Sequence, residues 1–284
     1  MVTTTQEFRT LADMSPAEVE SADFSTLVGL LNEPNMPSGG GKTVRRVVDL
    51  ARLRPGAKVL EVGSNTGYTS IEFAAWVDGQ VTGIDINPLS VLHARAKAEA
   101  AGVGNVRFDA GDGKALPYAD GAFDLVFCSN VTSFIDDHAA ARDEYYRVVA
   151  PGGWMVAAPI YYATEPPEGL RCEVGEAIGV ELALTDQAYW MSLFGSERAT
   201  LVEQETYEYV RQSDERLAGY AAEVVARGSH DASDAVVGAA QQRLHYFYDL
   251  FDRNLAYARY DILMYRCDHP NPESILHTTR PVVR

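Results

Sequence analysis

Residues 58–69 read KVLEVGSNTGYT and decide the fold of this chain of 284 residues. An apolar run short enough for a buried strand stops at a glycine-rich turn, and SIEFAAW at residues 70–76 follows with helical spacing. Gly63 and Gly67 let backbone N–H groups approach a ligand closely, and Asn65 tolerates positive φ better than other non-glycine residues. Because a helix N-terminus favours electron-rich groups, the stretch predicts a strand, loop and helix that cradle a nucleotide.

The composition indicates a globular protein with an acidic surface. Apolar residues make up 46% of the chain, and 24 Lys and Arg stand against 40 Asp and Glu, a formal net charge of −16. This charge disfavours nucleic acid, anionic membranes and polyanionic substrates as partners. The three cysteines are widely spaced, and the sequence has neither a leader pattern nor an apolar run long enough to span a membrane. We therefore expect a cytoplasmic protein without a disulfide framework.

Strands and helices alternate from residue 58 to about residue 159, which is typical of a parallel sheet covered on both faces. The predicted strands are 58–62, 81–85, 106–108, 124–128 and 154–158, and the predicted helices lie near 67–77, 89–101 and 137–149. Residues 160–182 are expected to form a long excursion without core structure. The pattern predicts a doubly wound sheet.

We divide the chain into four segments. Residues 1–38 are expected to supply N-terminal lid helices and residues 39–160 the nucleotide-binding core. Residues 161–258 are expected to form a cap that includes a further strand near 199–210, and residues 259–284 a closing strand and a tail. The end of the cap, residues 213–258, is helical in pattern, broken near Gly228, and rich in tyrosine and phenylalanine. Tyrosine favours surfaces that are partly wet or that contact a ligand, so we expect a small, partly apolar organic substrate.

Polar residues follow three later strands at positions that suit a nucleotide. Asp85 ends the second strand, where it can accept both hydroxyl groups of a ribose, although capping of the helix that opens at Pro88 is an alternative. Asp112 follows the third strand, where it can accept the amino group of an adenine, and a plain Asp-Gly turn is the alternative. Asn130 follows the fourth strand at the crevice that open α/β sheets use for ligands.

Five motifs resemble, in order and spacing, those of the class I S-adenosylmethionine-dependent methyltransferases. They are VLEVGSNTG at 59–67, GID at 83–85, GDG at 111–113, FDLV at 123–126 and YRVVAPGG at 146–153. The resemblance implies an α/β fold with a doubly wound, mostly parallel seven-stranded sheet whose last strand is reversed, here joined by a helical, aromatic-rich cap. It also implies transfer of a methyl group from S-adenosyl-L-methionine to a small organic metabolite, with S-adenosyl-L-homocysteine as the product.

The family pattern assigns the parts of the cofactor to particular residues. The methionine part is expected at Glu61 and the loop at 63–67, and the sulfonium near Asn130. The ribose is expected at Asp85 and the adenine at Asp112. The full set of cofactor-binding residues that we expect is Glu61, Gly63, Ser64, Asn65, Gly67, Asp85, Ile86, Gly111, Asp112, Gly113 and Asn130. No metal site is expected, because no histidine and cysteine cluster has the spacing of one.

Catalytic residues are harder to find, because methyl transfer depends mainly on positioning the acceptor and excluding water. The candidate bases are His245, Tyr161, Tyr162, His138 and His230, and each has a structural alternative. His138 lies in the first turn of a predicted helix and is expected to face solvent. An aromatic-rich cap is also compatible with a homodimer.

Three other functions compete with methyl transfer. An enzyme of non-methylation chemistry, for example one that cyclises the cofactor, would keep the same binding residues. A nicotinamide-dependent oxidoreductase would also use a glycine loop and a ribose-binding acid, but the third glycine of its loop and a Tyr-x-x-x-Lys motif are missing. A non-catalytic binding subunit would not need all of the cofactor residues. The sequence does not identify the methyl acceptor.

Overall fold

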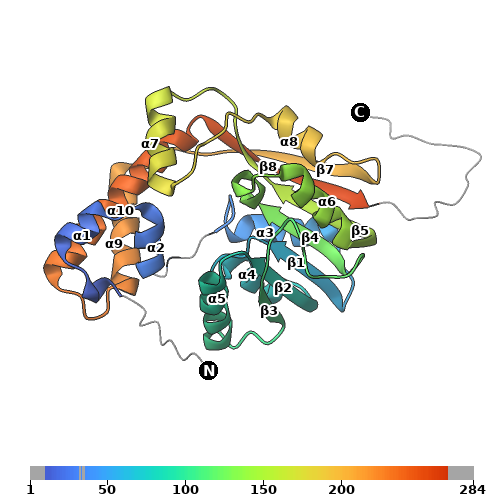
Figure 1. Cartoon of the computed structure of the whole chain (residues 1–284), viewed down its shortest axis with the longest axis horizontal. Helices are drawn as coiled ribbons and strands as arrows, with labels where there is room; N and C mark the ends of the chain where they lie inside the picture. The colour runs from blue at the N-terminus through green and yellow to red at the C-terminus, as the bar shows by residue number, and fades with distance from the viewer. Residues whose placement is uncertain (1–9, 32, 34–35, 268–284) are drawn as a thin grey trace, which may run out of the picture.

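A computed structural model describes residues 10–31, 33 and 36–267 of the chain. A sheet with helices on both faces forms the larger part, and a group of helices lies beside it at the left of Figure 1. The predicted tail at 268–284 and the first nine residues of the predicted lid lie outside the described residues. None of the described helices is long and apolar enough to cross a membrane.

The described residues form one sheet of eight strands. Their bounds are β1 Ala57–Val62, β2 Gly79–Asp85, β3 Val106–Ala110, β4 Phe123–Ser129, β5 Val149–Ala158, β6 Ile160–Tyr162, β7 Ala199–Glu208 and β8 Ala258–Cys267. The order is β3-β2-β1-β4-β5-β8-β6, and β7 also pairs with β8. β1 to β5 pair in parallel, whereas β8 is antiparallel to β5, β6 and β7. The predicted doubly wound, mostly parallel sheet with a reversed closing strand is therefore confirmed.

The structure has eight strands where seven were predicted, because Pro159 separates β5 from β6. Proline has no N–H to donate to a strand ladder, and β5 ends at Ala158, directly before it. The chain then resumes as β6, in which Ile160 pairs with Tyr260 of β8. Since β5 pairs with the same strand, β6 extends β5 along β8 after an interruption of one residue.

Neighbouring side chains of β1 pack into different hydrophobic clusters on the two faces of the sheet. Val59 packs with α3 and α4, and Leu60 packs with α6 and α8. α5 covers β3 through a smaller cluster. The bounds of these helices are α3 Gly41–Ala51, α4 Tyr68–Trp76, α5 Pro88–Ala100, α6 His138–Val148 and α8 Gln187–Phe194. Both faces of the central strands are therefore buried, as their nearly continuous apolar sequence predicts.

A further hydrophobic cluster unites helices from both halves of the sequence. They are η1 Leu11–Asp13, α1 Pro16–Ser21, α2 Phe24–Leu31, α7 Glu168–Ile178, α9 Asp214–Gly228 and α10 Asp234–Leu255, and we call this group the cap. Leu27 of α2 and Leu244 of α10 are both fully buried in it. α9 ends at Gly228, where the sequence predicts a break, and Ser233 caps α10 by accepting a hydrogen bond from the N–H of Val236.

Candidate active site

The loop between β1 and α4 has the backbone conformation that its sequence predicts. Gly63 and Gly67 have φ of 79° and 90°, and Asn65 has φ of 44°. A Cβ on Gly63 would lie 2.4 Å from a methyl carbon of Val131, and a Cβ on Gly67 would lie 2.8 Å from the ring of Phe108. Both positions therefore require glycine, for the backbone angle and for the space.

Asp85 fastens this loop to the end of β2. Its Oδ2 accepts a hydrogen bond of 2.8 Å from the N–H of Asn65, and its Oδ1 accepts one of 2.9 Å from the N–H of Asn87. The helix that follows is capped by Asn87, whose side chain accepts a hydrogen bond from the N–H of Leu89. The capping role that was the alternative for Asp85 therefore belongs to Asn87. Ile86, between them, is 72% exposed.

Glu61 lies in β1 and is only 4% exposed. Its Oε2 accepts a hydrogen bond of 2.5 Å from the hydroxyl of Ser70 in α4. Burial raises the pKa of Glu61 to about 7, although hydrogen bonds from Ser70 and Thr69 oppose the shift. A cation bound nearby would favour the ionised form of this carboxyl group.

Two buried hydroxyl groups near the carboxyl ends of β1 and β4 have no hydrogen-bond partner within the described part of the chain. They are Ser64 Oγ, in the glycine loop, and Ser129 Oγ, at the end of β4. β4 is the neighbour of β1, so the two unpaired groups belong to adjacent strand ends. Buried polar atoms are normally paired, and unpaired ones beside a loop of this shape fit a polar ligand.

Asp112 lies in the loop after β3 and takes part in a local turn. Its Oδ1 accepts a hydrogen bond of 2.9 Å from the N–H of Lys114. Gly111 packs so closely on β2 that a Cβ there would lie 2.8 Å from Cδ1 of Ile84, and a Cβ on Gly113 would lie 3.3 Å from Val62. The turn that was the alternative for Asp112 is present, and its Oδ2 has no hydrogen-bond partner in the part of the chain that the structure describes.

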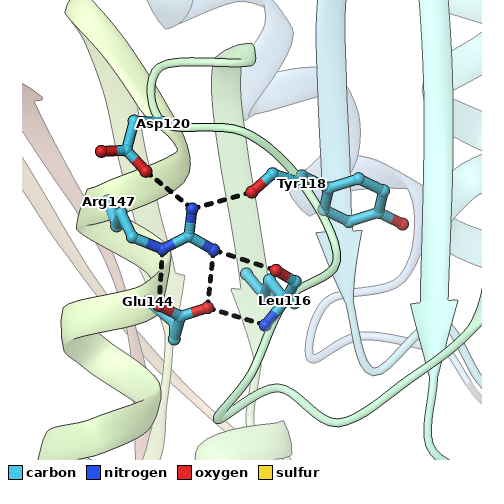
Figure 2. A network of polar contacts seen from close by, with 5 residues as sticks. All are labelled: Leu116, Tyr118, Asp120, Glu144 and Arg147. Carbon is cyan, nitrogen blue, oxygen red and sulfur yellow. Dashed lines mark hydrogen bonds and ion pairs between the residues drawn. The ribbon is translucent and has the colours of Figure 1, made fainter.

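The end of the same loop is held by Arg147 of α6 (Figure 2). Its guanidinium donates hydrogen bonds of 2.9 and 2.7 Å to the carbonyl oxygens of Leu116 and Tyr118. It also donates to the carboxylates of Glu144 and Asp120, at 2.6 to 2.8 Å. Glu144 in turn accepts a hydrogen bond of 2.7 Å from the N–H of Leu116. One arginine therefore fixes the path of the chain after the predicted adenine site.

A cavity of about 1640 Å³ lies between the sheet and the cap. Asn65, Thr66 and Asn130 line it from the loops after β1 and β4, and α2, α7, α9 and α10 line it from the cap. Of the predicted cofactor residues, Asn65 and Asn130 line this cavity, whereas the others lie in β1, in β2 or in the loops after β1, β2 and β3. The described residues contain no group of three or more side chains that could hold a metal ion.

Tyr161 and Tyr162 of β6 line the cavity, but their hydroxyl groups are bonded within the protein. Tyr161 donates a hydrogen bond of 2.8 Å to the buried carboxylate of Asp261 and accepts one of 3.0 Å from Gln187. Burial raises the pKa of Tyr161 to about 12. Tyr162 donates to the side-chain oxygen of Asn254, and burial raises its pKa as well. Both phenols are therefore protonated donors at neutral pH.

His245 makes a contact within the cap, in line with its structural alternative, whereas His138 is placed differently from expectation. His245 faces α9, where its Nε2 lies 2.8 Å from Asp214 Oδ1, and it is not among the described residues that line the cavity. His138, which we expected to face solvent, lines the cavity. Its Nδ1 lies 2.5 Å from Tyr189 Oη, and its ring lies 5.5 Å from that of Trp190. Both aromatic partners come from α8, and the sequence contains no signal that this helix packs there.

Comparison with protein families gives a match to the methyltransferase domain over residues 59–153. A demethylmenaquinone methyltransferase of Thermus thermophilus is 38% identical over 126 residues, which cover 44% of this chain and 56% of the relative. A ubiquinone/menaquinone biosynthesis C-methyltransferase of Hydrogenovibrio crunogenus is 34% identical over 125 residues, which cover 43% of this chain and 49% of the relative. The chain therefore matches about half the length of these curated relatives.

Two solved structures share the fold over most of their length. The MccD protein has a TM-score of 0.70 and 23% identity, with 82% of this chain and 100% of the other covered. The [4+2]-cyclase SpnF has a TM-score of 0.63 and 18% identity, with 92% and 98% covered. These likenesses extend beyond residues 59–153, so the arrangement of core and cap has counterparts in known structures.

Proposed function

We propose that this chain, which contains a class I S-adenosylmethionine-dependent methyltransferase domain, transfers a methyl group from S-adenosylmethionine to a small organic molecule in the cavity between the sheet and the cap. One observation carries the proposal: the glycine loop of the matched domain and the apolar helices of the cap line the same cavity. A cofactor held by the loop and a substrate held by the cap would therefore meet.

The residues around the loop fit the cofactor chemically. Glu61 would favour the ammonium group of the methionine part, because a cation lowers the cost of ionising this buried carboxyl group. Ser64 and Ser129 have buried hydroxyl groups that a polar ligand would satisfy. Asp85 would accept the hydroxyl groups of the ribose, and Asp112 the amino group of the adenine.

The side chains of this chain would mainly position the acceptor and exclude water. When bound, S-adenosylmethionine supplies a methyl group that is already activated by the sulfonium. If Nδ1–H of His138 donates to Tyr189 Oη, the ring's Nε2 is the acceptor and can take a proton from the methyl acceptor. His138 thereby replaces His245, Tyr161 and Tyr162 as the group best placed for this role. His245 is not among the described residues that line the cavity, and the hydroxyl groups of Tyr161 and Tyr162 donate to Asp261 and Asn254.

A binding and product assay tests the proposal. Calorimetry with S-adenosylmethionine, S-adenosylhomocysteine and NADH would measure cofactor choice, and mass spectrometry would count methyl groups transferred to a panel of phenols, enols and amines. We expect binding of the first two ligands only, and one S-adenosylhomocysteine formed for each methylated product. NADH binding, or conversion of an acceptor without S-adenosylhomocysteine, would favour an oxidoreductase or non-methylation chemistry instead. Methylation of nucleic acid in place of small molecules would also overturn the proposal.

A further inference from the structure

We propose that the substrate is elongated and largely apolar, and that its non-reacting end is neutral and occupies the cap side of the cavity beside Gly29. The inference rests on the proposed function for the position of the reacting end, at Asn130 and His138. The position of the apolar end rests on the cap alone.

The size of the cavity is the first argument. Pockets for small molecules usually enclose about 300–1,000 Å³. The cavity here measures about 1640 Å³, and its lining runs from the glycine loop to α9 and α10. A compact substrate beside the cofactor would leave the cap side unfilled, whereas a long substrate would fill it.

The lining of the cap side is the second argument. Its surface is formed mainly by aliphatic and aromatic side chains from four helices, among them Val28, Val174, Ile178, Leu217, Phe251 and Leu255. Side chains of this kind bind apolar groups through the hydrophobic effect, without directional bonds.

The charges around the cavity are the third argument. Among the described lining residues, Lys97 of α5, on the core side, is the one lysine or arginine. The cap side contains Glu33, Glu181 and Asp252. Glu33 forms an ion pair with Arg227 at 3.2 Å and Asp252 forms one with Arg211 at 2.9 Å, and both arginines lie outside the lining. Among the residues that the structure describes, the cap side therefore offers no lysine or arginine to a phosphate or carboxylate, so a neutral end group fits better than an anionic one.

Gly29 provides the most specific observation. It lies in α2 and lines the cavity, and a Cβ added there would meet no atom within 4 Å. Gly228 shows the opposite situation at the contact of α9 with α2, because a Cβ there would lie 2.6 Å from the carbonyl oxygen of Leu31. Gly219 of α9 and Gly238 of α10 have equally open surroundings, but of these three cap glycines only Gly29 lines the cavity. The space beside Gly29 is therefore space inside the cavity, where an apolar group of a ligand can lie.

Binding of three phenols to the full chain tests the proposal without requiring turnover. The probes are 4-ethylphenol, 4-octylphenol and 8-(4-hydroxyphenyl)octanoic acid, each titrated with and without S-adenosylhomocysteine. We expect the wild type to bind 4-octylphenol at least tenfold more tightly than 4-ethylphenol, and the octanoic acid more weakly than 4-octylphenol. Equal affinities for the two alkylphenols, or tighter binding of the acid, would overturn the proposal.

Substitution at Gly29 tests where the alkyl chain of the phenol binds. We expect Gly29→Phe to reduce the difference between the alkylphenols to about threefold or less while the affinity for 4-ethylphenol is kept. Gly219→Phe is the matched control, because a Cβ at Gly219 of α9 also meets no atom within 4 Å but the residue does not line the cavity. If the affinities of Gly29→Phe for the two alkylphenols differed as much as those of the wild type, the alkyl chain would bind elsewhere. If the wild-type chain did not bind S-adenosylhomocysteine, the proposed function would be refuted. The phenol titrations without S-adenosylhomocysteine would still decide this inference.

Discussion

The backbone N–H of Asn65 donates a hydrogen bond of 2.8 Å to the carboxylate of Asp85. This bond connects the left-handed residue of the glycine loop to the end of the neighbouring strand β2. The carboxylate therefore shapes the loop in addition to its proposed contact with the ribose.

Asp85→Ala should weaken binding of S-adenosylhomocysteine by about 1–3 kcal/mol, because the ribose hydroxyl groups and the N–H of Asn65 would all lose their acceptor. Asp85→Asn should have a smaller effect, since its side-chain oxygen still accepts one hydrogen bond. Titration calorimetry would measure both, with Asp49→Ala on the exposed face of α3 as the control. Wild-type affinity in Asp85→Ala would show that the ribose lies elsewhere.

Glu61 should make stability fall as the pH rises. Its pKa is about 7 in the folded protein and about 4.5 in the unfolded chain, so the folded protein retains a proton that the unfolded chain loses between these values. The stabilisation is complete below pH 4.5 and is lost as the pH rises through 7, by at most about 3 kcal/mol. Glu61→Gln should remove this part of the slope.

Urea unfolding at several pH values between 4.5 and 8 measures the slope. Glu99→Gln, an exposed position on α5, is the control and should keep the wild-type slope. A slope that is the same in wild type and Glu61→Gln would mean that Glu61 is ionised in the folded protein throughout this range.

Arg147→Lys should lower the free energy of unfolding by about 1–2 kcal/mol, because a lysine cannot donate to two carbonyl oxygens and two carboxylates together. The Arg147 guanidinium lowers the pKa of Glu144, so the part of this stabilisation that comes from the Glu144 carboxylate is present above pH 4.5 and is lost as the pH falls through the lowered pKa. Chemical unfolding at pH 7 and pH 3.5 would measure both effects. Arg45→Lys, at an exposed pair with Asp49, should change little, and an equal loss there would mean that the network has no special role.

His138→Gln should lower single-turnover rates by about a hundredfold or more and change cofactor affinity by less than a few-fold, if this histidine accepts the proton. Tyr189→Phe should have a smaller effect of the same kind, because it removes the partner of Nδ1. His245→Gln is the control outside the cavity, and a greater loss there would restore His245 as the candidate. Rates need to be measured with an acceptor found in the product assay.

The sequence predicts the core better than the cap, because the structure of the core follows from patterns within short stretches of sequence. The strands of the core and the glycine loop depend on apolar runs and on residues with special backbone angles, such as Gly63 and Asn65. The helix α7 was not predicted, because Gly169 and Gly175 indicate a loop. In the structure, a Cβ on Gly175 would lie 2.7 Å from the carbonyl oxygen of Val180, so this glycine allows a close contact within a helical segment.

Local sequence patterns also do not predict the roles of polar side chains. His138 contacts Tyr189 and Trp190 only because α8 packs beside α6. The hydroxyl group of Tyr161 donates a hydrogen bond to Asp261 of β8. Such contacts join residues far apart in the sequence, and periodicity within one segment carries no information about them.

The composition of the cap has a consequence for folding order. Leu27 precedes the core in the sequence and Leu244 follows it, yet both are buried in the same cluster. During synthesis, strands β1 to β4 can pair as soon as they leave the ribosome, whereas α2 must wait for α9 and α10. Contacts of such high sequence separation form slowly, and the apolar face of α2 stays exposed in the meantime. The N-terminal helices of this chain are therefore the segment that chaperones would protect during synthesis.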